Sequence, residues 1–429
     1  MNKIRQYIST FVLTRGFFIA LLGSAFIYLD HYALSYPILT TLFAILFFTL
    51  LLREKTPVWF STGFFTGFFW FWWVSISFQH YNMLWAIPIV MLAMGFLYAF
   101  IFWFIAYLSE KIPALLTLHS SLFTLTVKAL GLLLFSYIHP FGFDWFKPEL
   151  MFVNSYIGIE KWQFAIVLAA IVLALWRAQL LYLFLIVFAY QPGSDIHPKI
   201  PENMQLVTMH TPVQDKWDKS QHPKIFKEIF KEIDTAIEKK KTLIILPESV
   251  FPLFLNYKKS LIKKLRKRAQ KITIVTGGLY WNKKTPHNSA YIFNKKRIII
   301  ANKVLLVPFG ESNPLPDFLS KWVNKVFYDG AVDYIASDKI TDYTIDGITY
   351  RNAICFEATS ERLYEGRPEK MIVLSNNGWF TPSIEPTLQK LLLQYYSKKY
   401  GTAIYHAVNM SDSYIIDKGN VTRCPSLQK

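Results

Sequence analysis

Long apolar runs in the first 190 residues constrain the fold of this 429-residue chain more than any other feature. A helix that crosses a bilayer needs about 20 mostly apolar residues. Residues 1–190 contain ten Lys or Arg and six Asp or Glu, whereas residues 191–429 contain 36 and 23. The sequence therefore predicts a membrane-embedded helical part followed by a charged, water-exposed part. The apolar runs lie at residues 10–29, 35–52, 57–78, 83–108, 113–138, 162–176 and 178–191.

The last two runs, which are separated only by Arg177, decide the number of membrane crossings. Each is short for a span, so together they form two spans, a hairpin or one interrupted segment. We expect two, which makes residues 1–191 a polytopic transmembrane domain of about seven spans. Lys3 and Arg5 precede the first run, and the first two loops of the opposite side contain no Lys or Arg, so the positive-inside rule places the N-terminus in the cytoplasm. Seven spans carry residues 192–429 out of the cytoplasm, whereas one fewer would leave them inside.

Charge and cysteine content narrow the function classes. The net charge of +17 divides into +4 before residue 191 and +13 after it. A basic domain beside a membrane suits anionic lipid headgroups, and without an RNA-binding or helix-turn-helix motif we expect no nucleic-acid partner. Two cysteines cannot form a disulfide framework, and we expect Cys424 to lie in a mobile polar tail. The nine histidines show no ligand spacing, so no metal site is expected.

Beyond a turn-rich linker at residues 191–195, the pattern alternates between strands and helices. This alternation predicts an α/β or α+β domain of about 230 residues, which is long enough for one substantial core. The expected strands cover residues 205–209, 242–246, 272–277, 289–293, 297–301, 349–354, 371–375, 403–409 and 414–417, and the expected helices cover 226–240, 260–271 and 387–400.

Cys355 is the first candidate for chemistry, because it ends a predicted buried strand and precedes a predicted turn into a helix. A thiol at such a junction is exposed near the positive end of a helix, which favours the thiolate. The alternative is a small buried apolar side chain, which is the commoner role of a lone cysteine.

Two upstream strand ends carry groups that complement a thiol. Glu248 follows the strand at 242–246, while Lys303 and Glu311 flank a short apolar run. A thiol needs a base, and burial raises the pKa of a carboxylate toward a useful range. A fixed ammonium stabilises the oxyanion of a tetrahedral intermediate. Singly, each residue is more often a helix-start, surface or turn residue; their order and their strand-end positions together favour covalent acyl transfer.

The order of these motifs resembles the Glu-Lys-Cys arrangement of the nitrilase superfamily. Combined with the apolar first half, it resembles the bacterial apolipoprotein N-acyltransferases over essentially the whole chain. Further matching segments are Val213-Gln-Asp-Lys-Trp217, Ser375-Asn-Asn-Gly-Trp-Phe380, Ser383-Ile-Glu-Pro386, and Ala407-Val-Asn409 with the following Ser411 and Ser413.

The resemblance implies an α-helical transmembrane bundle joined to an α/β nitrilase-like four-layer αββα sandwich. It implies Cys355 as nucleophile, Glu248 as general base and Lys303 as the residue that stabilises the tetrahedral intermediate. An acyl chain would pass from a phospholipid to Cys355 as a thioester, and then to the N-terminal amine of a diacylglyceryl-cysteine apolipoprotein. This ping-pong reaction needs no metal or cofactor. The resemblance also implies supporting roles for Trp217, Glu311, Phe356 and Glu357.

Location follows from the same resemblance. We expect a monomeric, multi-pass protein of the bacterial inner membrane, with residues 192–429 as a nitrilase-like catalytic domain facing the periplasm. Two features depart from the family pattern. Family members commonly have Tyr where this chain has Phe356, and they usually end in another transmembrane helix where this chain has a polar tail. We expect activity to survive both changes.

Two further hypotheses concern the access of lipid to the site and the charge of Lys128. Apolar side chains at helical spacing in residues 316–327 predict a stripe that dips into the outer leaflet, and residues 251–255 could line the same acyl groove; ordinary core packing is the alternative for both. Lys128, inside the fifth apolar run, is a functional intramembrane charge, a snorkelling side chain or a helix-end residue.

Two other functions use the same residues differently. A membrane-tethered amidase or nitrilase would share the three catalytic groups but would need neither seven spans nor apolar loops beside the site. A membrane scaffold without enzyme activity would bind lipid or partners only, and the intact set of Glu248, Lys303 and Cys355 argues against it.

Overall fold

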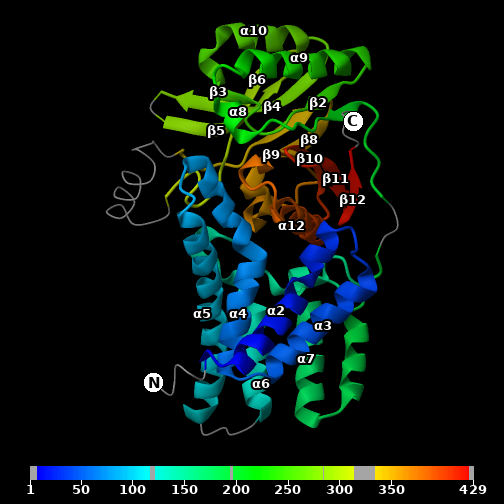
Figure 1. The fold of residues 1–429 in the computed structure, drawn as a ribbon. Coiled ribbons are helices and arrows are strands. Elements are labelled where there is room, and N and C mark those ends of the chain that lie inside the picture. Colours follow the sequence, from blue (N-terminus) through cyan, green and yellow to red (C-terminus); the bar gives the residue numbers. More distant parts are fainter. Residues whose placement is uncertain (1–6, 116–120, 194–196, 284, 314–333, 425–429) are drawn as a thin grey trace. The chain divides into compact units, whose positions relative to one another are not determined.

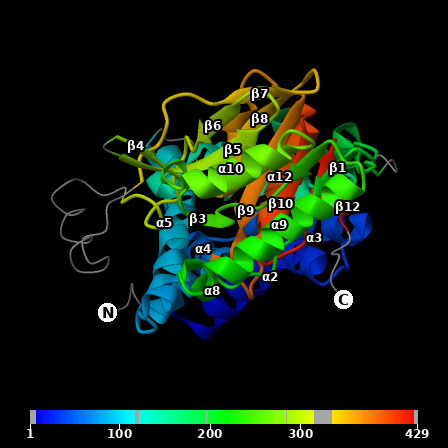
Figure 2. The same ribbon diagram turned by 90° about the horizontal axis from the view of Figure 1, so that it is seen from above.

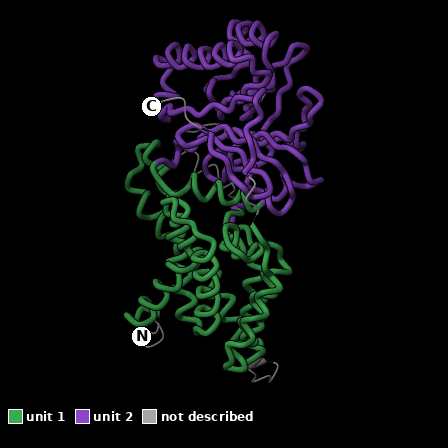
Figure 3. The backbone as a smooth tube through the Cα atoms, turned by 90° about the vertical axis from the view of Figure 1, so that its right-hand side faces the viewer, with its two compact units in different colours: residues 1–139, 144–194, 382–395 green, residues 140–143, 195–381, 396–429 purple. Residues whose placement is uncertain are grey.

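The computed structural model describes residues 7–115, 121–193, 197–283, 285–313 and 334–424. The chain divides into two units that exchange short segments (Figure 3). The first comprises residues 1–139, 144–194 and 382–395, and the second comprises residues 140–143, 195–381 and 396–429.

The first unit is built from apolar helices (Figure 1). Two of the described helices, Thr10–His31 and Ala86–Ile112, are long and apolar enough to cross a membrane. Many large apolar side chains lie on the outer faces of the helices, and Leu180 and Phe184 expose 79% and 76% of their surface. Such a surface suits contact with lipid. The helices are α2 (Thr10–His31), α3 (Pro37–Arg53), α4 (Thr56–Phe71), α5 (Ala86–Leu115), α6 (Ser121–Leu134) and α7 (Lys161–Arg177), with 3₁₀ segments η1 (Trp72–Tyr81), η2 (Phe135–Tyr137), η3 (Pro140–Gly142, of the second unit), η4 (Pro148–Phe152) and η5 (Leu180–Ala189).

The last two apolar runs form a hairpin of two separate segments. The chain leaves α7 through Ala178 in the left-handed region (φ 53°) and returns as η5. The carbonyl of Ala189 accepts hydrogen bonds from the Gly158 N–H (2.9 Å) and the Gln163 side-chain amide (3.3 Å), so η5 ends beside the start of α7. Because a 3₁₀ helix rises about 2 Å per residue, η5 is about 20 Å long. The two runs are thus antiparallel, and their crossing of a bilayer stays a prediction.

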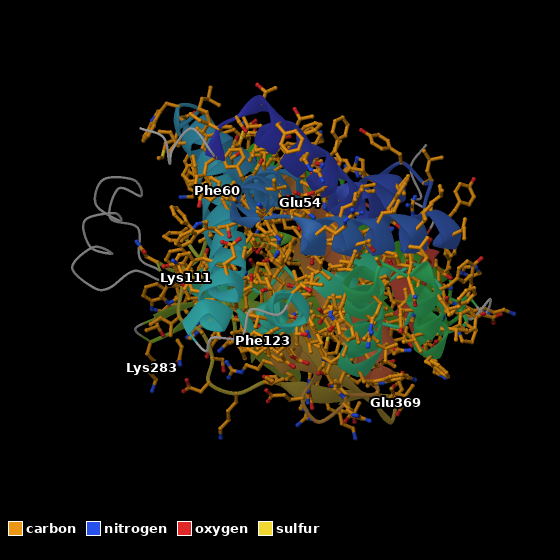
Figure 4. The ribbon with its side chains drawn as sticks, turned by 90° about the horizontal axis from the view of Figure 1, so that it is seen from below. Glu54, Phe60, Lys111, Phe123, Lys283 and Glu369 are labelled. Carbon is orange, nitrogen blue, oxygen red and sulfur yellow. The ribbon has the colours of Figure 1, made fainter. Side chains whose placement is uncertain are left out.

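Lys128 has a helix-end role. Its ammonium donates to the carbonyls of Glu54 (2.6 Å) and Leu52 (3.4 Å), at the C-terminal end of α3. Carbonyls at this end of a helix lack partners within the helix, and in an apolar bundle they must find them elsewhere. Glu54, labelled in Figure 4, also pairs with Arg15. Of the roles predicted for Lys128, these contacts favour the helix-end role.

The second unit contains two six-stranded sheets. In the first, β1, β2 and β4 are parallel, β5 and β6 continue antiparallel, and β3 pairs with β4. The second has the order β12-β11-β10-β9-β8-β7, with β8, β9 and β10 parallel. The strands are β1 (Met204–Leu206), β2 (Leu243–Ile245), β3 (Phe251–Phe254), β4 (Thr273–Asn282), β5 (Thr285–Phe293), β6 (Ile298–Asn302), β7 (Asp342–Ile345), β8 (Ile348–Ile354), β9 (Lys370–Asn376), β10 (Ala403–Asn409), β11 (Tyr414–Asp417) and β12 (Asn420–Arg423).

Alternating strand residues build the layers. Ile245 and Val275 point to the second sheet and share a buried cluster with Leu374, whereas Ile244 and Ile274 point to the opposite face. On that face α9 (His222–Glu238) and α10 (Lys259–Arg268) lie side by side (Figures 1 and 2).

Helix α12 (Glu385–Tyr400) supplies the fourth layer, where its Tyr396 and Tyr400 stack on Tyr364. The predicted four-layer αββα sandwich is confirmed.

Two expectations about this unit are wrong, and a third concerns residues outside the described ranges. Cys424 is not in a mobile tail: it follows the unpredicted strand β12, its N–H donates to the Ser413 carbonyl (2.8 Å), and burial raises the pKa of its thiol to about 11. Phe251 does not line a groove, because it is fully buried against Phe226 of α9 (5.1 Å between ring centroids). The apolar stripe at 316–327 lies outside the described residues.

Candidate active site

Cys355 lies where β8 ends, as predicted, and its backbone has a left-handed φ of 53°. A non-glycine residue in this region is strained, and such strain concentrates at functional sites. The expected helix after it is only the five-residue 3₁₀ segment η7 (Cys355–Thr359). A single turn has a small dipole, so neighbouring charges are the stronger influence on the thiol.

Glu357 fastens the cysteine segment to the lysine segment. Its two carboxylate oxygens accept hydrogen bonds from the backbone N–H groups of Ile354 (2.7 Å), Val304 (2.6 Å) and Leu305 (3.2 Å). Burial raises the pKa of Glu357 to about 7, against the opposing effects of Lys303 and these three donors. The predicted supporting residue therefore fixes the spacing between Cys355 and Lys303.

Lys303 follows β6 and is almost completely buried. Its Nζ lies 2.7 Å from Glu311 Oε2. Burial alone would lower the pKa of Lys303, but the charges of Glu311, Glu248 and Cys355 raise it above its ordinary value. The ammonium thus stays charged within electrostatic reach of the thiol.

Asn288, on β5, holds two carboxylates together and was missed in the sequence. Its side-chain Nδ2 group donates to Glu248 Oε1 (2.8 Å) and to Glu311 Oε1 (2.7 Å). Burial raises the pKa of Glu248, and the charges of Lys303 and Lys216 oppose this. A polar residue one position before the predicted strand at 289–293 was the only available signal.

Helix α8 (Val213–Trp217) brings an unpredicted lysine to Glu248. Lys216 is 2% exposed, and its Nζ donates to the backbone carbonyl of Glu248 (3.3 Å). The next residue, Trp217, is 39% exposed and makes no hydrogen bond or ring contact with the described residues. The segment before α8 is held by Asn409, whose side chain bonds the N–H (2.9 Å) and the carbonyl (2.8 Å) of Thr211.

Aromatic rings flank the nucleophile. Phe356 is buried, and its ring stacks on Phe143 (5.9 Å between centroids, 5° between planes). Phe141 meets Phe309 edge to face (5.8 Å). Phe141 and Phe309 each lie in a Pro-Phe-Gly tripeptide, and their φ values, 54° and 60°, are both left-handed. Stacking needs only a ring, so Phe356 keeps this contact without the hydroxyl of a tyrosine.

The assembled groups are a thiol, a buried carboxylate with a raised pKa and a charged ammonium. Together they suit covalent acyl transfer, in which the carboxylate takes the thiol proton and the ammonium faces the oxyanion. Within the described ranges, no three His, Cys, Asp or Glu side chains gather in a way that could hold a metal ion.

The second unit thus has a nitrilase-like four-layer αββα fold, and it carries at its strand ends the Glu, Lys and Cys side chains that covalent acyl transfer needs. Residues 10–192 match the family model described as the apolipoprotein N-acyltransferase integral membrane domain. The chain is 40% identical to the apolipoprotein N-acyltransferase of Wolinella succinogenes over 92% of this chain and 94% of that protein. It is 35% identical to that of Helicobacter pylori, over 90% and 91%. The chain therefore belongs to the apolipoprotein N-acyltransferase family.

Solved structures give a weaker likeness. A carbon-nitrogen hydrolase from Helicobacter pylori matches with a TM-score of 0.39 and 12% identity, over 52% of this chain and 85% of that one. A nitrilase-superfamily amidase from Nesterenkonia matches with the same TM-score and 11% identity, over 52% and 84%.

Proposed function

We propose that this protein transfers an acyl chain from a phospholipid to the N-terminal amine of diacylglyceryl-cysteine apolipoproteins, through a thioester on Cys355. The relatives that match most of the chain are named apolipoprotein N-acyltransferase. The observation that carries the mechanism is the contact network that gathers Glu248, Lys303, Glu311 and Asn288 beside the Cys355 segment.

In the first half-reaction, the Glu248 carboxylate takes the proton from the Cys355 thiol. The thiolate attacks the carbonyl carbon of a phospholipid ester, and the resulting oxyanion faces the Lys303 ammonium. When the intermediate collapses, the bond to the glycerol oxygen breaks and Glu248 returns the proton to that oxygen. The products are a lysophospholipid and the thioester.

In the second half-reaction, the neutral amine of the apolipoprotein attacks the thioester carbon. The nitrogen gives a proton to Glu248, the carbon–sulfur bond breaks, and Cys355 recovers the proton from Glu248. An amide and the free enzyme result. Glu311 and Asn288 hold Lys303 and Glu248 in place through both steps.

For location we propose seven membrane crossings in the bacterial inner membrane, a monomer, and a catalytic domain from residue 192 that faces the periplasm. The antiparallel hairpin of α7 and η5 supports an odd number of crossings, because it gives the last two apolar runs opposite directions. Positive charges before the first run support a cytoplasmic N-terminus.

The two cysteines of the chain allow a matched test. Full-length wild type, Cys355→Ala and Cys424→Ala are incubated with phospholipid and measured by intact mass. We expect an acyl adduct on wild type and on Cys424→Ala, none on Cys355→Ala, and loss of the adduct when a diacylated lipopeptide is added.

The opposite results are equally clear. An adduct that persists in Cys355→Ala would contradict the assigned nucleophile. Wild type that yields neither adduct, lysophospholipid nor free fatty acid would contradict acyl transfer, and turnover of small amides without phospholipid would then favour a hydrolase.

A further inference from the structure

A second buried ammonium lies in the candidate site and has no part in the two half-reactions above. Lys216 Nζ makes one hydrogen bond, to the Glu248 carbonyl, although an ammonium carries three N–H donors. Among the described residues its side chain makes no other hydrogen bond or ion pair. A buried cation with unused donors is costly, so it calls for a functional explanation.

The backbone that Lys216 holds is itself strained. The Glu248 carbonyl precedes Ser249, whose φ of 49° is left-handed. Below this turn the Gly277 N–H donates to the Pro247 carbonyl (3.3 Å). Lys216 therefore holds the turn that presents the base.

The groups around Lys216 define its electrostatic setting. Its ammonium interacts with the charges of Glu248 and of Cys355. From α9, His222 Nε2 lies 3.2 Å from the Lys216 backbone carbonyl, which fixes the end of α8. Asn409 anchors the segment before α8, so the lysine is held from both ends.

We propose that Lys216 is a positioning residue for acyl transfer: its ammonium fixes the Glu248–Ser249 turn and stabilises negative charge at Cys355, in addition to Lys303. This rests on the proposed function, because it assigns Lys216 to the same two half-reactions. The two N–H groups of Lys216 that make no hydrogen bond can donate to negative charge that develops only during the reaction.

A pH signature follows from the burial of this lysine. Burial lowers the pKa of Lys216 to about 8, against the opposing charges of Glu248 and Cys355. The positive charge is therefore present below about pH 8 and is lost above it. Arginine in its place would stay charged throughout this range, because a guanidinium does not deprotonate in proteins.

The test uses full-length protein purified in detergent with Cys424→Ala, so that Cys355 is the only thiol and phospholipid is present only when it is added. Lys216→Met, Lys216→Arg and the control Lys219→Met, which changes an exposed lysine three residues along the chain, are compared with this parent. The readouts are the pH profile of Cys355 alkylation by iodoacetamide, which needs no lipid, and the rate of acyl-enzyme formation from phospholipid.

For Lys216→Met we expect acyl-enzyme formation to slow about 100-fold. We also expect the alkylation midpoint to rise by about one pH unit, because a positive neighbour favours the thiolate. Lys216→Arg should keep the parent's midpoint and retain acylation activity above pH 8, where the parent loses it. Lys219→Met should match the parent.

Two results would overturn the proposal. One is an unshifted alkylation midpoint in folded Lys216→Met. The other, decisive even if that variant does not fold, is Lys216→Arg losing activity above pH 8 as the parent does. Failure of the proposed function would look different: no variant, including the parent, would form an acyl-enzyme, while the alkylation profiles would still report on Lys216.

Discussion

The amide of Asn288 is the smallest feature on which the site depends. It donates to Glu248 and Glu311 at once, so it keeps two negative groups at a fixed separation around one ammonium, that of Lys303. Hydrogen bonds to charged groups contribute about 1.5–3 kcal/mol each.

Replacing Asn288 tests this role. We expect Asn288→Ala to slow acyl-enzyme formation by about 10- to 100-fold, since one charged hydrogen bond to the base is lost. Asn288→Asp should be worse near neutral pH, because a third carboxylate raises the pKa of Glu248 further and moves the acid limb of the rate to higher pH. Stopped-time intact-mass measurements from pH 5 to 9 give both rates. Asn203→Ala, which removes a bond to Thr242, is the control; an unchanged rate in Asn288→Ala would contradict the assignment.

Glu357 gives a second residue-scale prediction. Its oxygens face three backbone donors, so Glu357→Gln must turn an NH₂ group toward at least one of them. We expect a loss of about 1–3 kcal/mol in stability and a slower acylation step. Thermal unfolding of the full-length protein measures the first quantity. Glu365→Gln, at an exposed position, should change neither, and a fully stable Glu357→Gln would show that the clamp is not needed.

At the scale of elements, the candidate site is formed by residues that follow the ends of three strands. Glu248 follows β2, Lys303 follows β6 and Cys355 follows β8, and the sequence predicts all three because each comes within two residues of the end of a predicted strand. Asn288 and Lys216 escaped prediction for a different reason. Their partners are distant in sequence, so only the pairing of β4 with β5 and the placement of α8 bring them to the base.

Strand β4 supports the base directly. A Cβ atom on Gly277 would lie 2.3 Å from the Ser249 nitrogen, whereas one on Gly278 would meet nothing nearer than 3.4 Å. We therefore expect Gly277→Ala to displace the turn after Glu248 and to abolish most acyl-enzyme formation, while Gly278→Ala stays close to wild type. Intact-mass kinetics on the two variants make the comparison. Equal activity of the two would mean that the turn is not held against β4.

Over the whole molecule, each unit includes a short segment from the other half of the sequence. Residues 382–395, which include the first part of α12, belong to the first unit, where Lys390 pairs with Asp30 (2.5 Å) and the Tyr395 hydroxyl donates to Glu149 (3.1 Å). Residues 140–143, in turn, belong to the second unit. Hydropathy predicted one boundary near residue 191, because it cannot reveal which short segments cross to the other unit.

Glu149 has three polar partners in the first unit: Lys161, Ser136 and Tyr395. It is fully buried and lies 2.7 Å from Lys161 Nζ, with Ser136 Oγ at 3.0 Å. Glu149→Gln removes the negative charge that faces the Lys161 ammonium, whose side chain is 25% exposed, and we expect a loss of about 1.5–3 kcal/mol, as for a hydrogen bond to a charged group. Tyr395→Phe removes one hydrogen bond and should cost less. Unfolding of the purified variants in detergent gives the order, and a Tyr395→Phe protein less stable than Glu149→Gln would contradict it.

The place of residues 382–395 also bears on biosynthesis. A ribosome makes the apolar helices first, then β1 to β9, and only afterwards the segment that Asp30, Asn154 and Glu149 contact. Until that segment emerges, these polar groups lack the contacts that Lys390, Gln394 and Tyr395 make with them in the finished protein. The membrane half therefore matures late, and a chain that stalls before residue 382 would present it incomplete to the proteases that survey the membrane.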